Sequence, residues 1–370
     1  MREFCRCLDP CKPVRLVNDM KSIVVDKIAS VAQHNDLKSE LRLSTDILCE
    51  EGVLIAVRVL NNKSRYNQLE LTSGRMATVT MGDVVVGALG HRNALRGYSG
   101  HLPTELTKGD HVQLLNIGGA IGICDSANPD VGPPFECEVL GGVLEFPYLG
   151  ERIGVPARAG SSSLDMDAVL KTNGVPVIAL AGTCMDSGKT VASCAIVSRL
   201  RHLGLNVSAC KATGVSLRRD VLAMEDAGAT DTMIFSDLGI VTTTAENGPA
   251  LTRSLLSALS NARPDVIVLE LGDGLLGSYG VAAILEDDQL REALTVVVLC
   301  ANDPVGAWGG AKILRDEFNI EPAVVTGPAT DNDVGVQQIS ERLALPGINA
   351  LSNGPELGDM IAGLLEKEAS

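Results

Sequence analysis

The sequence predicts an α/β protein whose C-terminal part is a mostly parallel sheet with helices on both faces, preceded by a smaller β-rich barrel or sandwich domain. After residue 172, apolar runs of strand length alternate with amphipathic segments of helix length. Between about 71 and 150, short β-type runs are separated by Gly, Pro and Asn turns. Aromatic residues make up only 3% of the chain, so the core must consist mainly of Val, Leu, Ile and Ala, which suits a sheet covered by helices.

The changes in pattern predict four segments, which are a mixed N-terminal segment (1–70), a β-rich domain (71–150), a small polar linker (151–172) and the α/β domain (173–370). In the first segment, helical spacing predicts a helix over 20–36, and an apolar run predicts a strand from Val53 to Val59. In the β-rich domain we expect strands over 77–80, 83–89, 111–116, 120–124 and 137–140.

The apolar runs of the C-terminal part are nearly continuous in Val, Ile and Leu, which is typical of parallel strands buried on both faces. Strands are expected near 175–181, 205–210, 231–235, 265–270, 294–300, 321–325 and 347–350. Helices are expected near 188–203, 218–227, 248–261, 281–292, 305–318, 332–343 and 355–367. Because right-handed crossovers bring the strand ends to one edge, we expect the ligand there.

Composition excludes several classes of function. The formal net charge is -15 and there is no Lys/Arg cluster, which argues against a nucleic-acid partner. No apolar stretch reaches the length of a membrane span, and the N-terminus lacks an apolar signal-peptide core. Ten cysteines, mostly within apolar runs, fit reduced thiols in the cytoplasm. Cys5, Cys7 and Cys11 have no matching His or Cys pair downstream, so a mobile tail is favoured over a metal site there.

The stretch GTCMDSGKT, residues 182–190, lies between a predicted buried strand and a predicted helix. Backbone N–H groups and a helix N-terminus bind phosphate in that arrangement. Gly182 and Gly188 are one residue further apart than usual, so Thr183 takes the place of the first glycine. Lys189 is expected to reach the terminal phosphates and Thr190 to ligate Mg²⁺; a helix start without a ligand is the alternative. The expected nucleotide-binding residues are Gly182, Thr183, Cys184, Met185, Asp186, Ser187, Gly188, Lys189, Thr190 and Val191.

This loop resembles the G-T-x4-G-K-T loop of dethiobiotin synthetase and its relatives, a SIMIBI-type branch of the P-loop NTPases that includes amide-forming ligases of cobalamin synthesis. In that family the second strand ends in a lysine followed shortly by Ser/Thr-Gly, which matches Lys211, Thr213 and Gly214 in NVSACKATG. The resemblance covers roughly 175–345. It implies that Lys211 contacts a substrate carbamate or phosphate, with Thr213 and Gly214 beside it, and that the protein is a homodimer.

The family also has two acidic magnesium ligands, for which Asp220 and Glu270 are the best-placed residues and Asp226 is second to Asp220. Independently of the resemblance, Asp220, Glu270 and Asp273 at one sheet edge would repel one another, and a divalent ion would relieve that repulsion while Thr190 adds a neutral ligand. We therefore expect Thr190, Asp220 and Glu270 at the metal and Asp273 near the substrate. The simpler interpretations are a solvated helix start for Asp220, a strand-end charge for Glu270 and a turn-shaping role for Asp273.

Three further loops are candidates. Asn302 follows a buried strand in a loop placed to lie over the base or substrate, and Trp308 in the same loop either covers the ligand or packs on the surface. Thr326 follows the next strand, in a neighbourhood that contacts the base in the resembling family. The stretch GHRNALRGYSGHLP either holds an acidic substrate or is an exposed inter-strand loop; its basic and aromatic residues are His91, Arg92, Arg96, Tyr98 and His101.

The leading hypothesis is an ATP- and Mg²⁺-dependent ligase or kinase that phosphorylates a small carboxylate- or amine-bearing metabolite, with Lys189 and Lys211 as the catalytic cations. The C-terminal half also looks like the P-loop domain of the DUF1611 group, some members of which are linked to N-acylation of D-amino acids. A coenzyme A-dependent N-acyltransferase is therefore the second hypothesis. A nucleotide-dependent switch or metallochaperone is the third.

Overall fold

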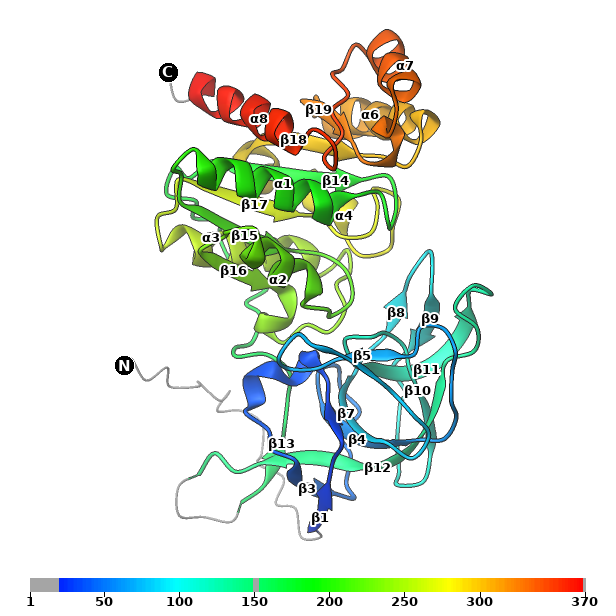
Figure 1. Cartoon of the computed structure of the whole chain (residues 1–370). Coiled ribbons are helices and arrows are strands. Elements are labelled where there is room, and N and C mark those ends of the chain that lie inside the picture. Colours follow the sequence, from blue (N-terminus) through cyan, green and yellow to red (C-terminus); the bar gives the residue numbers. More distant parts are fainter. Residues whose placement is uncertain (1–19, 149–152, 369–370) are drawn as a thin grey trace.

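The computed structural model describes residues 20–148 and 153–368, and places a β-rich part at one end of the molecule and an α/β part at the other (Figure 1). An eleven-stranded sheet lies in the first part and a six-stranded sheet in the second. The predicted α/β fold with a β-rich portion before it is therefore confirmed. The three N-terminal cysteines, Cys5, Cys7 and Cys11, lie outside the described residues.

The β-rich part is built around a closed barrel. Its ring of pairing runs β12–β4–β7–β11–β10 and returns to β12, so each of these five strands has a neighbour on both sides. Their bounds are β4 Leu54–Val59, β7 Val84–Leu89, β10 His111–Leu114, β11 Ala120–Ala127 and β12 Phe135–Glu145. Closure leaves no open edge within the ring and encloses a core of aliphatic side chains.

The remaining strands of this part extend the barrel or lie beside it. They are β1 Met20–Val24, β2 Lys27–Ile28, β3 Glu40–Ser44, β8 Arg92–Asn93, β9 Tyr98–His101 and β13 Val155–Pro156, with β5 Gln68–Glu70 and β6 Met76–Thr78 forming a separate pair. Strand β4 confirms the prediction for Val53 to Val59, and β6, β7, β10, β11 and β12 overlap the other expected strands.

The helix predicted over 20–36 is wrong. Residues 20–24 form β1, and a 3-10 helix, η1 (Ser30–Asn35), occupies the end of the segment. Strand β1 pairs antiparallel with β3, so residues 40–44 supply the hydrogen-bond partners that the local apolar spacing does not reveal. This is a case in which tertiary pairing overrides a helical pattern.

The α/β part is a parallel sheet with strand order β16–β15–β17–β14–β18–β19. Its strands are β14 Val177–Gly182, β15 Val207–Lys211, β16 Asp231–Ile234, β17 Val266–Glu270, β18 Leu294–Cys300 and β19 Val324–Thr326. The helices are α1 Lys189–His202, α2 Arg219–Asp226, α3 Gly248–Ser260, α4 Val281–Glu286, α5 Asp288–Ala293, α6 Pro304–Phe318, α7 Asp333–Leu343 and α8 Gly354–Glu368; the short 3-10 helices are η2 Phe235–Leu238 and η3 Pro328–Thr330.

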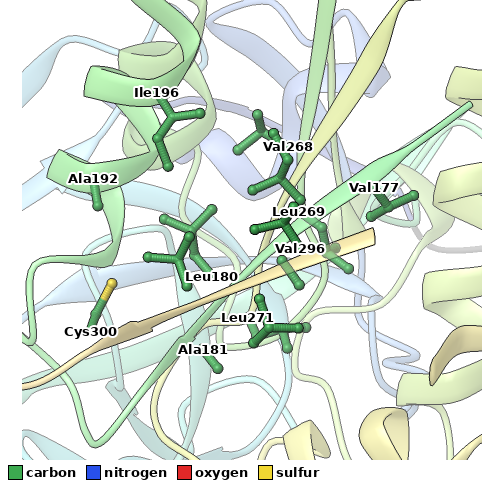
Figure 2. Packing of buried hydrophobic residues seen from close by; sticks show 14 of the residues in the cluster. Val177, Leu180, Ala181, Ala192, Ile196, Val268, Leu269, Leu271, Val296 and Cys300 are labelled. Atoms are coloured by element: carbon green, nitrogen blue, oxygen red, sulfur yellow. The ribbon is translucent and has the colours of Figure 1, made fainter. Parts of the chain in front are cut away.

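Helices cover the sheet on both faces. Helices α1 and α8 pack against each other on one side, and α3, α4 and α5 pack together on the other. Figure 2 shows the core, where Leu180 of β14 lies among Ile196 of α1 and Val268 of β17. No helix in the described part of the chain is long and apolar enough to cross a membrane.

Two of the predicted elements of the α/β part differ from the structure. The helix expected over 281–292 is two helices, because Asp287 has extended backbone (φ -69°, ψ 116°) and its side chain caps α5 by accepting from Leu290 N at 3.0 Å. The strand expected over 347–350 is reduced to one parallel bridge between Val325 and Gly347.

The two parts meet along residues 215–243 of the α/β part, a surface we call the seam. Asn116 of the barrel donates its side-chain amide to Ser216 O at 2.7 Å, and Glu51 Oε1 accepts from the backbone N–H groups of Val241 and Thr242 at 3.0 and 2.8 Å. The segment after β12 joins both parts, since β13 pairs with β12 and Ser161 N donates to Asp237 O at 2.9 Å. These direct bonds hold the barrel against the loops that follow β15 and β16.

Candidate functional site: a phosphate loop beside a buried acidic cluster

The site is built on the turn between β14 and α1. Gly188 is the N-terminal cap of α1 with φ 88°, and Asp186 is also left-handed with φ 58°, so the loop curls tightly before the helix begins. A Cβ on Gly182 would lie 2.5 Å from Ser187 Oγ, which leaves room there only for glycine. Among the described residues, no acceptor is found for the N–H groups of residues 184–188. The loop thus offers a concave row of free donors, which is an anion-binding arrangement.

The Lys189 ammonium group is buried within this loop. It donates to Cys184 O at 2.9 Å, to Ser187 Oγ at 3.3 Å and to Asp273 O. A buried ammonium group needs acceptors, and here they come from the loop itself and from the turn after β17. The charge is therefore fixed beside the free N–H groups, where it adds to their attraction for an anion.

The glycine-rich turn after β17 closes the other side of the loop. Leu275 N donates to Gly182 O at 2.9 Å. A Cβ on Gly274 would lie 2.7 Å from Thr183 O and 2.8 Å from Cys184 Cα, so the two turns are in backbone contact. Asp273 is a non-glycine residue with φ 67°, a left-handed conformation that costs energy and that Asp tolerates better than most residues.

Four predicted side chains meet at the ends of β15 and β17 and the start of α1 and α2. Lys211 Nζ pairs with Asp220 and lies 3.8 Å from Glu270 Oε1. Thr190 Oγ1 donates to Glu270 Oε1 at 3.2 Å. Lys211 is 9% exposed and Glu270 only 2%, so this cluster is nearly dry. The simpler interpretation of Asp220 as a solvated helix-start residue is wrong, because the side chain is buried against Lys211.

Charge and burial set the protonation of this cluster. Burial favours a low pKa for Lys211, but the charges of Asp220 and Glu270 outweigh it and hold the pKa above its ordinary value. Burial likewise opposes ionisation of Asp220, yet the Lys211 ammonium keeps the carboxyl pKa below its usual range. Burial and the neighbouring Asp220 charge raise the pKa of Glu270 against the pull of Lys211 and Lys189. Lys211 and Asp220 are thus an ion pair. The positive charges of Lys211 and Lys189 do not offset the effect of burial and of Asp220 on the Glu270 carboxyl group.

The residues present fit a magnesium ion. Glu270 Oε2 is buried and has no hydrogen-bond partner among the residues that the structure describes, and Thr190 and Asp220 supply further oxygen atoms next to Glu270. Carboxylate and hydroxyl oxygens are the ligands that Mg²⁺ takes in proteins. Only two of these three groups are carboxylates, since the third is the Thr190 hydroxyl. Within the described ranges, no cluster of three or more His, Cys, Asp or Glu side chains could hold a metal ion. Asp226, the second candidate, is exposed at the end of α2 and lies apart from the cluster.

The other predicted residues lie around the loop. Asn302 donates its side-chain amide to Cys184 Sγ at 2.8 Å. Thr326 is fully buried, and its hydroxyl accepts from Ala350 N at 3.2 Å, while the next residue, Gly327, contacts the backbone of Ser187. Trp308 is 52% exposed on α6.

The substrate-side residues Thr213 and Gly214 follow Lys211 directly. Thr213 is fully buried and its hydroxyl donates to Gly272 O at 2.9 Å, and Gly214 has φ 130° and donates its N–H to Thr243 Oγ1 at 2.8 Å. The Thr213 bond ties the turn after β15 to the turn after β17, and the Gly214 bond ties it to the segment before α3. The Thr213 bond therefore helps to fix the position of Lys211, at the end of β15, relative to Asp273, in the turn after β17.

The barrel also reaches the site through the β8–β9 hairpin, residues 92–101, which projects toward the α/β part (Figure 1). Asn93 N donates to the Tyr279 hydroxyl at 3.1 Å, and Arg96 Nη1 lies 4.0 Å from Asp186 Oδ2 of the phosphate loop. Arg92 and Tyr98 are buried, whereas Arg96 and His101 are exposed. The exposed-loop interpretation of this stretch therefore holds for only some of its residues.

Two residues of this region were not singled out from the sequence. Glu70 of β5 is fully buried and its Oε2 accepts from Arg218 N at 2.8 Å, at the start of α2. Tyr279 anchors the hairpin. A carboxylate in a three-residue strand and a tyrosine in a glycine-rich loop carry no local signal, because their roles come from contacts between distant parts of the chain.

The parallel sheet, the tight loop after β14 and the lysine at the start of α1 define the class: the C-terminal half has a P-loop NTPase fold. No protein-family model matches the chain, and no curated protein matches it in sequence. Among solved structures, it is similar to the signal recognition particle receptor FtsY from Elizabethkingia anophelis (17% identity, TM-score 0.38, 52% of this chain and 66% of that chain). A DUF1611 family protein from Anabaena variabilis (13%, TM-score 0.39, 58% and 64%) and the hydrogenase maturation factor HypB from Archaeoglobus fulgidus (16%, TM-score 0.35, 52% and 91%) are also similar. Each of these similarities covers between 52% and 58% of this chain.

Proposed function

We propose that the protein is an ATP- and Mg²⁺-dependent ligase or kinase that transfers a phosphoryl group to a small carboxylate- or amine-bearing metabolite. The observation that carries this proposal is the phosphate loop. The N–H groups of residues 184–188 have no acceptor among the described residues, and the Lys189 ammonium group is buried against Cys184 O. Phosphoryl transfer depends mainly on positioning and on neutralising negative charge, and this loop supplies both.

Each residue has a defined part in the proposal. Lys189 exchanges its carbonyl partners for phosphate oxygens and stabilises the charge on the terminal phosphate. Lys211, held by Asp220 at the end of β15, binds the acceptor or the transferred group. Thr190, Asp220 and Glu270 hold the magnesium ion, which supplies charge neutralisation to the phosphates when bound. In this proposal Asn302 lies on the side of the base, and Gly214 and Asp273 lie on the side of the acceptor. Thr213 and Thr326 are fully buried and shape the turns around these sites.

The test is a thermal-shift measurement with ATP, GTP and acetyl-CoA, each with and without Mg²⁺, on the wild type and on Lys189→Ala. Because a ligand that binds only the folded state raises its stability, we expect MgATP to raise the melting temperature of the wild type and not of the variant. Lys312→Ala, an exposed lysine on α6, is the matched control and should behave as the wild type does.

The alternatives give different outcomes in the same experiment. Stabilisation by acetyl-CoA without metal dependence supports the N-acyltransferase instead. Binding of nucleotide with hydrolysis only in the presence of a partner protein supports the switch or metallochaperone. Absence of any Mg²⁺-nucleotide effect in the wild type removes the proposal.

The homodimer and the cytoplasmic location stay predictions, for which the measurements are sedimentation of the purified chain and fractionation of cells.

A further inference from the structure

Asp273 is a buried carboxyl group without a partner at the mouth of the phosphate loop. Asp273 is 8% exposed, and neither Oδ1 nor Oδ2 has a hydrogen-bond partner in the part of the chain that the structure describes. Its backbone is left-handed as well. A buried polar group left unsatisfied destabilises the folded state, and the left-handed backbone adds to that cost. Costs of this kind are typical of functional sites.

The position of Asp273 relative to the phosphate-binding lysine is fixed. Its backbone oxygen accepts from Lys189 Nζ, so the residue is tied directly to the group expected to hold the terminal phosphate. Its carboxylate lies over Gly277, where a Cβ would come 2.4 Å from Oδ2. Because Gly277 has no side chain, the turn has room for the Asp273 carboxylate.

The groups that face this carboxyl are known. Lys189 of α1, Arg92 of β8 and Lys211 of β15 favour its ionised form, and Tyr279 follows it in the same loop. Burial outweighs the three cations and raises the pKa of Asp273 above that of an ordinary carboxyl. The group is thus a stronger base than a solvated aspartate, and its own backbone oxygen contacts the Lys189 ammonium that is expected to hold the terminal phosphate.

We propose that Asp273 is the general base of the reaction, and that the acceptor therefore carries a proton-bearing nucleophile, a hydroxyl or an amine, and not an ionised carboxylate alone. This inference rests on the proposed function and narrows its substrate class. An ionised carboxylate needs no base in order to attack phosphorus, whereas a hydroxyl or amine group must lose a proton.

The oxygen or nitrogen of the acceptor forms a bond to the terminal phosphorus of the nucleoside triphosphate while its O–H or N–H bond breaks. The bond between that phosphorus and the bridging oxygen breaks, and its electron pair leaves on the nucleoside diphosphate. The proton passes to the Asp273 carboxylate, and water later removes it.

Water is itself a hydroxyl acceptor, so basal ATP hydrolysis by the full chain tests the inference without knowledge of the metabolite. We expect Asp273→Asn to lower kcat by about 100-fold or more, the range typical of a lost general base. The MgATP-induced rise in melting temperature should be unchanged. The wild-type rate should fall on acidification as Asp273 becomes protonated. The residual rate of the variant should fall less over the same range, because only the protonation of Glu270 then weakens the site.

Two further variants distinguish a base from a merely structural residue. Gly277→Ala keeps the carboxyl group but displaces it, so it should also lower kcat while leaving nucleotide binding intact. Asp36→Asn is the matched control, because Asp36 is exposed and also left-handed (φ 47°), and it should leave the rate and pH profile unchanged.

The outcomes separate this inference from the proposed function. Failure of the wild type to bind MgATP contradicts the proposed function and the inference together. A wild type that binds MgATP but does not hydrolyse it contradicts only the inference, because a base beside the terminal phosphate would activate water. An Asp273→Asn variant with the wild-type rate and pH profile contradicts it as well.

Discussion

At the scale of single residues, the site combines paired and unpaired buried charges. Lys211 and Asp220 satisfy each other, whereas Glu270 Oε2 and both carboxylate oxygens of Asp273 lack partners. In a protein with no ligand to bind, selection for stability would remove such groups or pair them. These three carboxylate oxygens belong to the strand end and turn after β17 that contact the phosphate loop, which is the arrangement expected of a site that a cation and a polar substrate complete.

The Lys211–Asp220 pair gives a prediction about stability. Lys211→Met leaves Asp220 and Glu270 buried without their cation, so we expect a loss of about 3 kcal/mol in the free energy of unfolding at neutral pH. Urea unfolding measures it. Lys312→Met, which breaks the exposed pair with Asp316 on α6, is the control and should cost about 0.5 kcal/mol or less.

The pH dependence of this loss follows from the pKa shifts. The contribution of Lys211, whose folded pKa is raised, is present below the unfolded pKa and is lost as pH rises through the folded value. The contribution of Asp220, whose folded pKa is lowered, is present above the unfolded pKa and is lost as pH falls through the folded value. The difference between wild type and Lys211→Met should therefore be largest near neutrality and shrink in acid. A pH-independent difference would contradict the ion-pair interpretation.

Sequence patterns identified most residues of the loop and the cluster, because strand ends of one parallel sheet must meet at one edge. Lys211, Asp220 and Glu270 were singled out from the resemblance to dethiobiotin synthetase and from their expected place at this edge, and the structure brings the three together. Patterns could not identify Glu70, because a carboxylate that caps a helix from another part of the chain has no local spacing. The geometry of Asp273 was equally hidden, since its unpaired state depends on how three turns pack.

At the scale of elements, the start of α2 depends on the barrel. Arg218 is the cap residue of α2 with no side-chain cap bond of its own, and its N–H donates to Glu70 Oε2 instead. The same carboxylate oxygen accepts from the Ser30 hydroxyl. Asp220 lies in the first turn of this helix, so Glu70 is a positioning residue for the Lys211–Asp220 pair.

Replacement of Glu70 tests that coupling. Glu70→Ala leaves the Arg218 N–H and the Ser30 hydroxyl unsatisfied, which should cost about 2 kcal/mol of stability. It should also raise the Mg²⁺ concentration needed for half-maximal ATP hydrolysis, an effect that simple destabilisation does not produce. Glu70→Gln keeps an acceptor oxygen and should restore the Mg²⁺ requirement. An unchanged Mg²⁺ requirement in Glu70→Ala would show that Asp220 is positioned without it.

At the scale of the whole molecule, the two parts differed in how far sequence could predict them. In the α/β part, the strands and helices follow one another directly along the chain. The alternation of apolar strand-like runs with amphipathic helix-like segments therefore located nearly every element. The barrel instead pairs strands far apart in the chain: β12 (Phe135–Glu145) lies beside β3 (Glu40–Ser44) and β4 (Leu54–Val59). Local patterns carry no information about such pairing, which is why β1 was predicted as a helix and β3 was missed.

The seam between the parts gives the last prediction. Gly118 of the barrel lies so close to the α/β part that a Cβ there would be 1.8 Å from Ser216 O. Gly118→Ala must therefore push the two backbones apart and break the 2.7 Å bond from Asn116 to Ser216 O. Gly363→Ala is the control, because a Cβ at that position in α8 meets nothing within 4 Å, and it should stabilise the protein by up to about 1 kcal/mol.

Hydrogen exchange measures the separation directly. In Gly118→Ala, the amides of Val241 and Thr242, which donate to Glu51 across the seam, should exchange faster, whereas the amides of β17 should stay protected. ATP hydrolysis should fall as well, because the barrel carries both Glu70 and the hairpin that contacts the phosphate loop. Normal exchange at Val241 and Thr242 would mean that the seam does not depend on this contact. Faster exchange with full activity would mean that the α/β part works without the barrel held in place.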